Sequence, residues 1–377
     1  MFREVIKPKK ARTRLIPMST RAKTGPESVV TLKSVARHVG LSPGTVSGVL
    51  NDSPSAAHIP QRTRERILAA ARELNYRPNF FARSLRKQRT YTLGIIANDL
   101  GDAYTSMVIA GIEKFVRERG YFFITGVHHH KRSLLESYSS MLVQRGVEGL
   151  ITVDLNLEYS PPLPTVAVSG HGNQSGVTNV VLNHHSAVHA ALKHLVDLGH
   201  RDIAFMRGHP ASSDSGPRWQ AICDVAPELG IELRPELIIQ FDVEEFSPEL
   251  GYPFAKQLLA RNKPFTALFA YNDLSAIGAM RAFQESGFRI PQDISVVGFD
   301  DIPAAVYYYP SLTTVRQPLG RMGDLAAHTL IERIEGKDDY PSELAVEGEL
   351  VVRESSGPAA RGYSGEIRLA EPIAMKA

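Results

Sequence analysis

The sequence holds a single cysteine, Cys223, among its 377 residues. One cysteine cannot form an intramolecular disulfide, and without a second thiolate nearby it cannot build a cysteine metal site. Long hydrophobic runs are lacking too, because segments such as LGIIA at 93–97 are far shorter than the roughly 20 residues that span a bilayer. A disulfide-stapled mini-protein is excluded, and we expect no membrane partner.

The N-terminal segment, MFREVIKPKKARTRLIP, lacks the apolar stretch of a secretory signal, so we expect a cytoplasmic protein. Met18 is a hypothetical alternative start, which would leave residues 1–17 out of the natural product. Several enzyme signatures are also missing, namely G-x-S-x-G, the Walker A loop and the dinucleotide glycine fingerprint. The sequence therefore predicts neither an enzyme nor a bound cofactor.

Positive charge is concentrated at one end of the chain. Residues 1–90 hold 19 Lys and Arg against 5 Asp and Glu, whereas residues 91–377 hold 24 against 35. A short basic segment joined to a larger acidic body indicates that one end binds a polyanion. Nucleic acid is the predicted partner.

The basic end has the pattern of a helix-turn-helix unit. Thr31 can cap a first helix over 32–39, Gly40 ends it, and Ser42 followed by Pro43 can begin a second helix over 43–50. Two short helices joined by a tight turn place the second helix in the major groove of DNA. The alternative for these residues alone is a helical hairpin without DNA-binding function.

The flanking segments complete the expected organisation of this end. Their boundaries are a disordered basic tail at 1–28, a DNA-binding domain at 29–77 with a third helix at 61–75, and a hinge helix or linker at 78–89.

From residue 93 onward, short apolar segments alternate with helix-length stretches. Continuously apolar strands separated by helices are typical of parallel sheets covered on both faces. About ten strands are expected, which is more than one such sheet comfortably holds. The sequence therefore predicts an α/β protein in which an all-α head precedes two doubly wound parallel-sheet subdomains.

The quoted segments resemble the lactose-repressor (LacI/GalR) family of bacterial transcription regulators. TLKSVARHVGLSPGTVSGVLN and TRERILAAARELNYRPNFFARSLR are similar to the family's DNA-binding head, and LGIIA, HLVDLGHRDIAF, FAYNDLSAIGAMRAFQESGFRIPQDISVVGFDD and PSLTTVRQP follow in the family's order. The resemblance covers residues 31–357 and implies a periplasmic-binding-protein-like domain for effector binding and dimerisation at 90–357. Its expected parts are lobe 1 at about 90–169 and 318–337, lobe 2 at about 170–317 and 338–357, and a tail at 358–377.

The second helix departs from the family's pattern. Where family members commonly present long polar side chains to base edges, this chain has Pro43, Gly44 and Gly48, which cannot make bidentate contacts with a base. We therefore expect the second helix to make few direct contacts with the bases, and we expect the tail and the hinge to share in sequence recognition. The DNA-binding residues predicted in the head are Thr31, Ser42, Pro43, Gly44, Thr45, Ser47, Gly48 and Asn51.

The hinge supplies a second predicted DNA contact. In the family, an ARSL-type segment becomes helical on operator DNA and its leucine enters the minor groove, which the resemblance assigns to Leu85 with Arg83 and Arg86 beside it. Eight residues are too short for a stable isolated helix, which agrees with folding on DNA. The alternative is that Leu85 packs on the effector domain.

Polar residues follow the predicted strands at their carboxyl ends, where open parallel sheets bind ligands. Carboxylates and amides around a cleft, with an arginine fork and aromatic rings, suit a polyhydroxylated ligand such as a sugar. Each residue alone is also compatible with a capped helix start or a solvated turn. The resemblance implies effector contacts at Tyr104, Arg218, Phe246, Asn272, Asp300 and Gln317.

The histidines do not predict a metal site. His128, His129 and His130 are adjacent, so they cannot all point at one ion, and in the predicted helix from residue 184 only His185 and His189 have ligand spacing. One further departure concerns Asn183-His184, which stands where the family usually has Asp-Asn.

These observations predict a homodimeric transcription regulator, most simply a repressor, that binds operator DNA and a sugar-like effector. A solute-binding protein for transport shares the two-lobed fold, but it needs an export signal and has no use for residues 31–86. An enzyme acting on the same small molecule is the other alternative, and it would consume its ligand.

Overall fold

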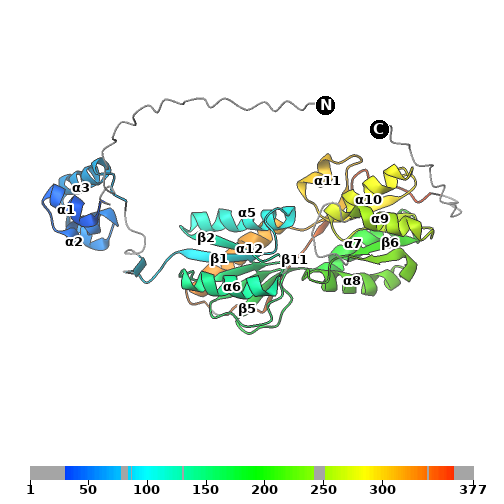
Figure 1. The fold of residues 1–377 in the computed structure, drawn as a ribbon, viewed down its shortest axis with the longest axis horizontal. Helices are drawn as coiled ribbons and strands as arrows, with labels where there is room; N and C mark the ends of the chain where they lie inside the picture. Colours follow the sequence, from blue (N-terminus) through cyan, green and yellow to red (C-terminus); the bar gives the residue numbers. More distant parts are fainter. Residues whose placement is uncertain are drawn as a thin grey trace, which may run out of the picture. The chain divides into compact units, whose positions relative to one another are not determined.

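The structure is a computed structural model that describes residues 30–77, 84–85, 87–129, 131–241, 251–337 and 339–360. The chain separates into two compact units, Met1–Gln88 and Arg89–Ala377, which are treated separately below (Figure 1). The predicted N-terminal tail, residues 78–83 of the hinge and residues 361–377 of the C-terminal tail lie outside the described residues.

Three helices form the head, and the first two have the predicted bounds. They are α1 (Leu32–Val39), α2 (Pro43–Leu50) and α3 (Gln61–Glu73), with a short 3-10 helix η1 (Pro54–His58) between the last two. The Thr31 side chain caps α1, and Gly40 ends it with a φ of 68°, a conformation that glycine adopts without strain. The Ser42 side chain caps α2. The helix-turn-helix prediction is confirmed.

The first lobe of the second unit is a six-stranded parallel sheet in the order β11-β5-β4-β3-β1-β2. Helices α5 (Ala103–Glu118) and α12 (Leu319–Ile334) pack together on one side of this sheet, and α6 (Arg132–Gln144) lies on the other side (Figure 1). The strands are β1 (Thr92–Ala97), β2 (Phe122–Val127), β3 (Leu150–Val153), β4 (Thr165–Val168), β5 (Val177–Leu182) and β11 (Glu343–Val346).

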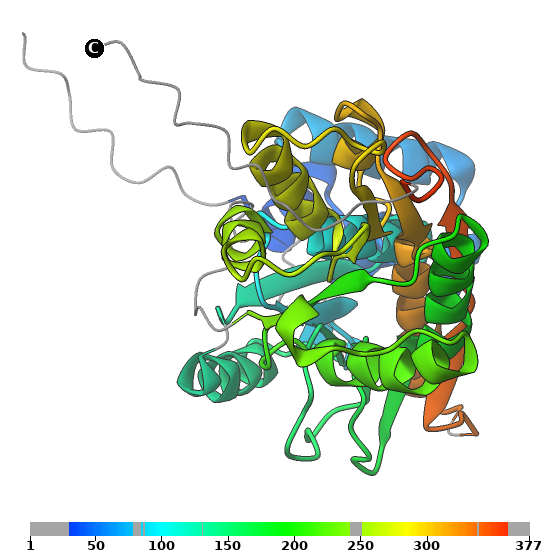
Figure 2. The ribbon, with the colours of Figure 1, turned by 90° about the vertical axis from the view of Figure 1, so that its right-hand side faces the viewer.

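The second lobe repeats this strand order as β12-β10-β9-β8-β6-β7, with β12 antiparallel to its neighbour. Figure 2 looks at this lobe from its end, with α7 and α8 paired on one side of the sheet and α9 and α10 paired on the other. The strands are β6 (Ile203–Arg207), β7 (Ile238–Gln240), β8 (Ala267–Phe269), β9 (Ser295–Asp300), β10 (Thr313–Arg316) and β12 (Glu349–Val351). The helices are α7 (His184–Asp197), α8 (Ser215–Glu228), η2 (Pro235–Leu237), α9 (Gly251–Ala260), α10 (Asp273–Glu285) and α11 (Pro303–Tyr307).

Two doubly wound parallel-sheet subdomains were predicted and are present, but the boundary between them differs from the prediction. Residues 170–182 and 338–346 were assigned to lobe 2, whereas β5 and β11 belong to the sheet of lobe 1. The reason is that β5 pairs in parallel with β4, and β11 pairs in parallel with β5. The chain therefore crosses between the lobes near residues 183, 317 and 347.

In the described part of the chain, no helix combines the length and apolarity needed to cross a bilayer.

The contact between α5 and α12 depends on glycines that let the two helices approach closely. A methyl group added to Gly111 would lie 1.9 Å from the carbonyl oxygen of Gly320, and one added to Gly323 would lie 2.1 Å from the carbonyl oxygen of Val108. Neither separation is tolerated between nonbonded atoms, so a side chain at either position must push the helices apart.

We expect Gly111→Ala to lower the free energy of unfolding by about 1–3 kcal/mol, because overpacking against a backbone atom forces α12 to move. Chemical denaturation followed by circular dichroism measures this loss. The matched control is Gly320→Ala, since a methyl group there meets nothing within 4 Å. Alanine favours the helix at both positions, so equal destabilisation by the two substitutions would contradict the packing argument.

Candidate functional site

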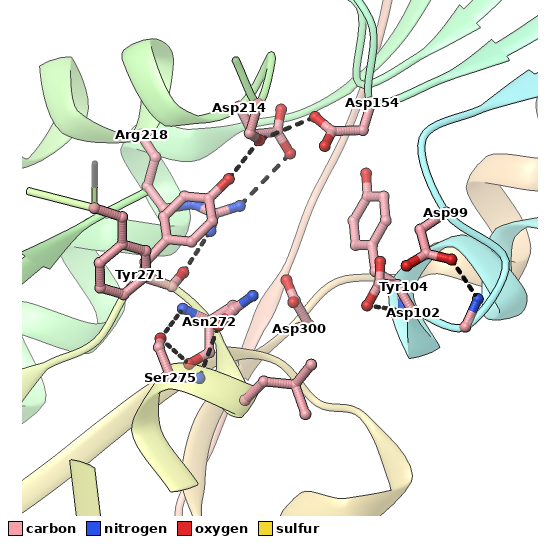
Figure 3. Close-up of a pocket in the computed structure, with 14 residues that line it drawn as sticks. Asp99, Asp102, Tyr104, Asp154, Asp214, Arg218, Tyr271, Asn272, Ser275 and Asp300 are labelled. Carbon is pink, nitrogen blue, oxygen red and sulfur yellow. Dashed lines mark hydrogen bonds and ion pairs between the residues drawn. The ribbon is translucent and has the colours of Figure 1, made fainter. Parts of the chain in front are cut away.

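A cavity of about 210 Å³ lies where the carboxyl ends of the strands of both lobes meet (Figure 3). Lobe 1 contributes residues that follow β1 and β3, and lobe 2 contributes residues that follow β6, β7 and β8 or end β9. This is the crevice predicted for open parallel sheets. Five of its lining residues are aspartates, whereas Arg218 is the one basic residue among those that line it.

The Arg218 side chain on α8 is buried and is contacted by a carbonyl oxygen, a carboxylate and two aromatic rings. Its Nη1 donates to the carbonyl oxygen of Tyr271 at 2.6 Å, and its Nη2 lies 3.5 Å from Oδ2 of Asp214. The guanidinium also lies over the rings of Phe299 and Tyr271, with its carbon 3.8 and 4.7 Å from their centroids. Its Nε has no partner among the described atoms. A ligand acceptor in the cavity would satisfy this arginine.

Asp300 ends β9 and faces the cavity from the second lobe (Figure 3). Its Oδ1 accepts a hydrogen bond of 2.7 Å from Nε2 of Gln317, and its backbone φ of 114° is one that side chains rarely adopt. Burial raises the pKa of Asp300 well above its usual range, although Arg218 opposes this rise. Gln317 is buried and is not among the residues that line the cavity; its hydrogen bond orients Asp300, and the contact of Gln317 with an effector stays a prediction.

Asp154 follows β3 and lines the cavity from lobe 1. Its Oδ1 accepts hydrogen bonds from the hydroxyl of Ser212 at 3.0 Å and from the backbone and hydroxyl of Ser213 at 2.9 and 2.7 Å. The Ser212 hydroxyl also pairs with the Tyr271 hydroxyl at 2.6 Å. Burial, with Asp214 nearby, raises the pKa of Asp154 to about 6. These bonds join lobe 1 to the loop before α8 in lobe 2.

Tyr104 and Asn272, two of the residues predicted to contact the effector, line the cavity. The Tyr104 hydroxyl lies 2.5 Å from the hydroxyl of Ser169, and burial raises its pKa. The Asn272 side chain caps α10 by accepting from the backbone nitrogen of Ser275 at 2.9 Å. Phe246 lies outside the described residues. Asn272 therefore combines the structural role considered for it with a place at the cavity.

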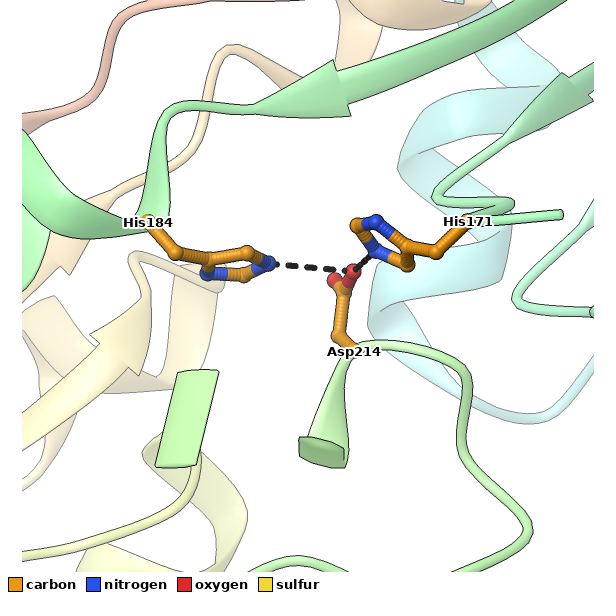
Figure 4. Close-up of side chains that lie close together, drawn as sticks. All are labelled: His171, His184 and Asp214. Carbon is orange, nitrogen blue, oxygen red and sulfur yellow. Dashed lines mark hydrogen bonds and ion pairs between the residues drawn. The ribbon is translucent and has the colours of Figure 1, made fainter. Parts of the chain in front are cut away.

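Sequence reasoning missed Asp214 and two histidines that contact it. Nε2 of His171 and Nε2 of His184 lie 2.8 and 3.2 Å from the same carboxylate oxygen, Oδ1 of Asp214 (Figure 4). Burial opposes ionisation of Asp214, but His184, His171 and Arg218 hold its pKa well below its usual range. Burial lowers the pKa of His184, although Asp214 opposes this. The departure at Asn183-His184 was the available signal for this cluster.

The exposed face of α2 carries part of the predicted DNA-binding set. Pro43, Gly44 and Asn51 are exposed, and Asn51 Nδ2 donates to the carbonyl oxygen of Ser47 at 2.8 Å. Gly48 is instead buried with Val46 and Val49, so it does not lie on the face that we expect to meet DNA. The remaining head residues of the prediction, Ser42, Thr45 and Thr31, take part in caps at the starts of α1 and α2.

In the hinge, the structure describes Ser84 and Leu85 in helical conformation, and Arg83 and Arg86 lie outside the described residues. The Leu85 side chain is 84% exposed. Most of the surface of this large apolar side chain is in contact with solvent, and a binding partner can bury it.

A helix-turn-helix head followed by a two-lobed domain with a polar cavity defines the class of DNA-binding regulators with a ligand-binding domain. Residues 31–79 match the family model of bacterial regulatory proteins of the lacI family, and residues 192–356 match that of the periplasmic binding protein-like domain. The chain is 35% identical over 336 residues to the HTH-type transcriptional repressor PurR of Erwinia tasmaniensis, a match that covers 87% of this chain and 97% of that repressor. This chain belongs to the lacI family of bacterial regulatory proteins.

Related proteins agree with that assignment. The PurR repressor of Yersinia pestis is 34% identical over the same share of the chain. Among solved structures, the lac repressor dimer bound to operator and the anti-inducer ONPF covers 87% of this chain and 99% of its own at 27% identity, with a TM-score of 0.78. The complex of the transcriptional regulator CelR with cellobiose also covers 87% of this chain, and all of its own, at 29% identity and a TM-score of 0.64. These relatives are transcription regulators, which decides against the enzyme and transport alternatives.

Proposed function

We propose that this protein is a repressor that binds a near-palindromic operator as a homodimer and is controlled by a sugar or sugar derivative. Such a protein acts in the bacterial cytoplasm, where its operator DNA is. The observation that carries the effector part of the proposal is the cavity in which Arg218, Asn272 and Asp300 lie beside aromatic rings.

The chemistry of the cavity favours a polyhydroxylated ligand. Carboxylates accept hydrogen bonds from hydroxyl groups, and an amide both accepts from them and donates to them. Tyr104, Tyr271 and Phe241 offer faces for the apolar side of a sugar ring. The similar regulator CelR was solved with cellobiose, which is a sugar. Residues of both lobes line the cavity, so a bound effector contacts both and favours one closure of the lobes. In a dimer, closure changes the spacing of the two hinge segments and hence the population that holds DNA.

The effector is tested by a thermal-shift screen of the full-length chain against sugars, sugar phosphates and amino sugars, with nucleobases as a second ligand class. A ligand that binds only the folded state raises the melting temperature by mass action. We expect a sugar to raise the melting temperature of the protein. Gel shift should then show that the same sugar changes the affinity of the protein for operator DNA. Stabilisation by nucleobases alone would contradict the sugar proposal.

For DNA, we expect footprinting on selected sequences to protect two half-sites related by a two-fold axis and about one helical turn apart, because each subunit supplies one helix-turn-helix unit. Affinity should fall steeply as salt rises, since the basic head releases counterions from DNA. Protection of isolated half-sites only, or an affinity that does not depend on salt, would contradict the proposed binding mode.

A further inference from the structure

The cluster of His171, His184 and Asp214 lies at the junction of the two lobes. His171 follows β4 of lobe 1, His184 begins α7 just after the chain crosses from β5, and Asp214 precedes α8 in lobe 2. The two imidazoles approach the carboxylate from different sides, and Figure 4 shows both rings pointing at it. The ligating atoms of the three side chains all lie within 4.8 Å of one another.

Asp214 does not have the usual role of an aspartate at this position. It is the residue before α8, where an aspartate normally accepts from the first turn of the helix, yet its side chain makes no capping hydrogen bond. The carboxylate is turned to the two histidines instead, and Asp214 is only 3% exposed. Burial of a carboxylate away from its cap is favourable only when other charged or hydrogen-bonding groups hold it.

The charge around the cluster leaves room for a cation. Asp154 and Asp300 line the same cavity as Asp214, and Arg218 is the one basic side chain among the lining residues. Arg218 approaches Asp214 through Oδ2, so Oδ1 is left for the two imidazoles. Buried charges in proteins are paired or coordinate metal ions, and Arg218 is the one permanently charged partner that approaches Asp214 among the described residues.

We propose that His171, His184 and Asp214 bind a divalent transition metal ion such as Zn²⁺. Two imidazole nitrogens and one carboxylate oxygen are a common ligand set for such ions. Bonds of about 2.0–2.1 Å in a tetrahedral site place ligand atoms about 3.3–3.4 Å apart. The observed separations of 2.8 and 3.2 Å between the imidazole nitrogens and Oδ1 need to open by about 0.1–0.6 Å, and the two nitrogens, which lie within 4.8 Å of each other, need to take up the same spacing.

The ion would join the lobes at the edge of the effector cavity. Its ligands come from both lobes, and Asp214 also lines the cavity. Three protein ligands leave a coordination position for water or for a hydroxyl group of the effector. The metal is then a co-ligand that stabilises one arrangement of the lobes, and its binding does not depend on the identity of the effector.

The test uses the full-length chain without an affinity tag, freed of metal by a chelator and then dialysed. Addition of Co²⁺ is expected to give the visible absorption of a four- or five-coordinate site, with no band from thiolate coordination, and Zn²⁺ is expected to displace it and raise the melting temperature. His184→Asn, which restores the family's usual residue, and His171→Gln should each weaken Zn²⁺ binding by about a hundredfold or more, since even loss of an outer-shell partner costs about 10–100-fold.

The matched control is His185→Asn, because His185 is exposed and adjacent to His184 in the chain. It should bind Co²⁺ and Zn²⁺ as the parent does. The proposal is overturned if the parent shows no Co²⁺ absorption, if both cluster variants keep it, or if His185→Asn loses it, which would place the metal on the surface of α7. Circular dichroism melts identify any variant that fails to fold, and the other cluster variant then decides.

Discussion

Arg218→Ala is expected to weaken effector binding by about tenfold to a hundredfold, which corresponds to about 1.5–3 kcal/mol for hydrogen bonds of a charged group. The guanidinium lines the cavity, its Nε has no partner among the described atoms, and its other nitrogens are fixed by Tyr271 and Asp214. It is therefore already oriented for a ligand acceptor. Calorimetry with the sugar found by thermal shift measures the loss.

Asp300→Asn should cause a loss of similar size, because the amide keeps the shape of the carboxyl group but puts an NH₂ donor where Asp300 has an oxygen that can accept a hydrogen bond. Operator binding without effector should stay within a few fold of the parent for both variants, since the substituted side chains lie in the second unit and not in the head. The matched control is Arg207→Ala, since Arg207 stacks on Trp219 with its guanidinium carbon 4.5 Å from the ring centroid and does not line the cavity. Undiminished ligand affinity in both cavity variants would place the effector elsewhere.

Local signals in the sequence were sufficient to predict the head. Thr31, Gly40 and Ser42-Pro43 act over a few residues through hydrogen bonds and backbone preferences, so the bounds of α1 and α2 follow from residues next to them. The register of apolar residues likewise predicted which positions are inside, as with Val35 and Val46. Gly48 was the exception, since a glycine gives no hydrophobic signal for its burial.

Long-range pairing could not be predicted from the same signals. The strand VTNVVL is interrupted by Asn179, which is nonetheless buried because its Nδ2 donates to the carbonyl oxygens of Gly172 and Ser342 at 2.8 and 3.2 Å. Ser342 is 163 residues away, so the partner that makes this strand possible is invisible to local patterning. The boundary between the lobes was misplaced for this reason.

The candidate site shows the same division between local and distant information. The correspondence with the family placed Arg218, Asn272 and Asp300 at the effector cleft, and all three line the cavity, whereas their contact with an effector stays a prediction. Asp214, His171 and His184 come together only in the folded chain, since 43 residues separate His171 from Asp214. Gln317 was also predicted to contact the effector, and this stays a prediction; its hydrogen bond to Asp300, which is 17 residues away, could not be predicted from local patterns in the sequence.

Leu85→Ala is expected to weaken binding to the selected operator by about 2–4 kcal/mol, roughly thirtyfold to a thousandfold, the order of the unstacking and contact terms of a minor-groove wedge. The Leu85 side chain is 84% exposed, and a wedge between base steps would bury this surface. Binding to random DNA should change little, because that binding comes from the basic residues and their counterions. Gel shift on both DNAs measures the two effects.

Two further variants separate a wedge from a general effect on the head. Leu85→Met keeps a flexible apolar side chain of similar volume, so it should retain most of the operator affinity. Leu68→Ala removes a leucine on α3 that is 42% exposed, and it should leave operator binding within a few fold of the parent. If Leu85 is a wedge, the loss of affinity should depend on the size of the side chain at position 85 and should appear with operator DNA but not with random DNA. Equal losses of Leu85→Ala on operator and random DNA would instead mean that Leu85 supports the fold of the hinge, because a misfolded hinge weakens every DNA complex.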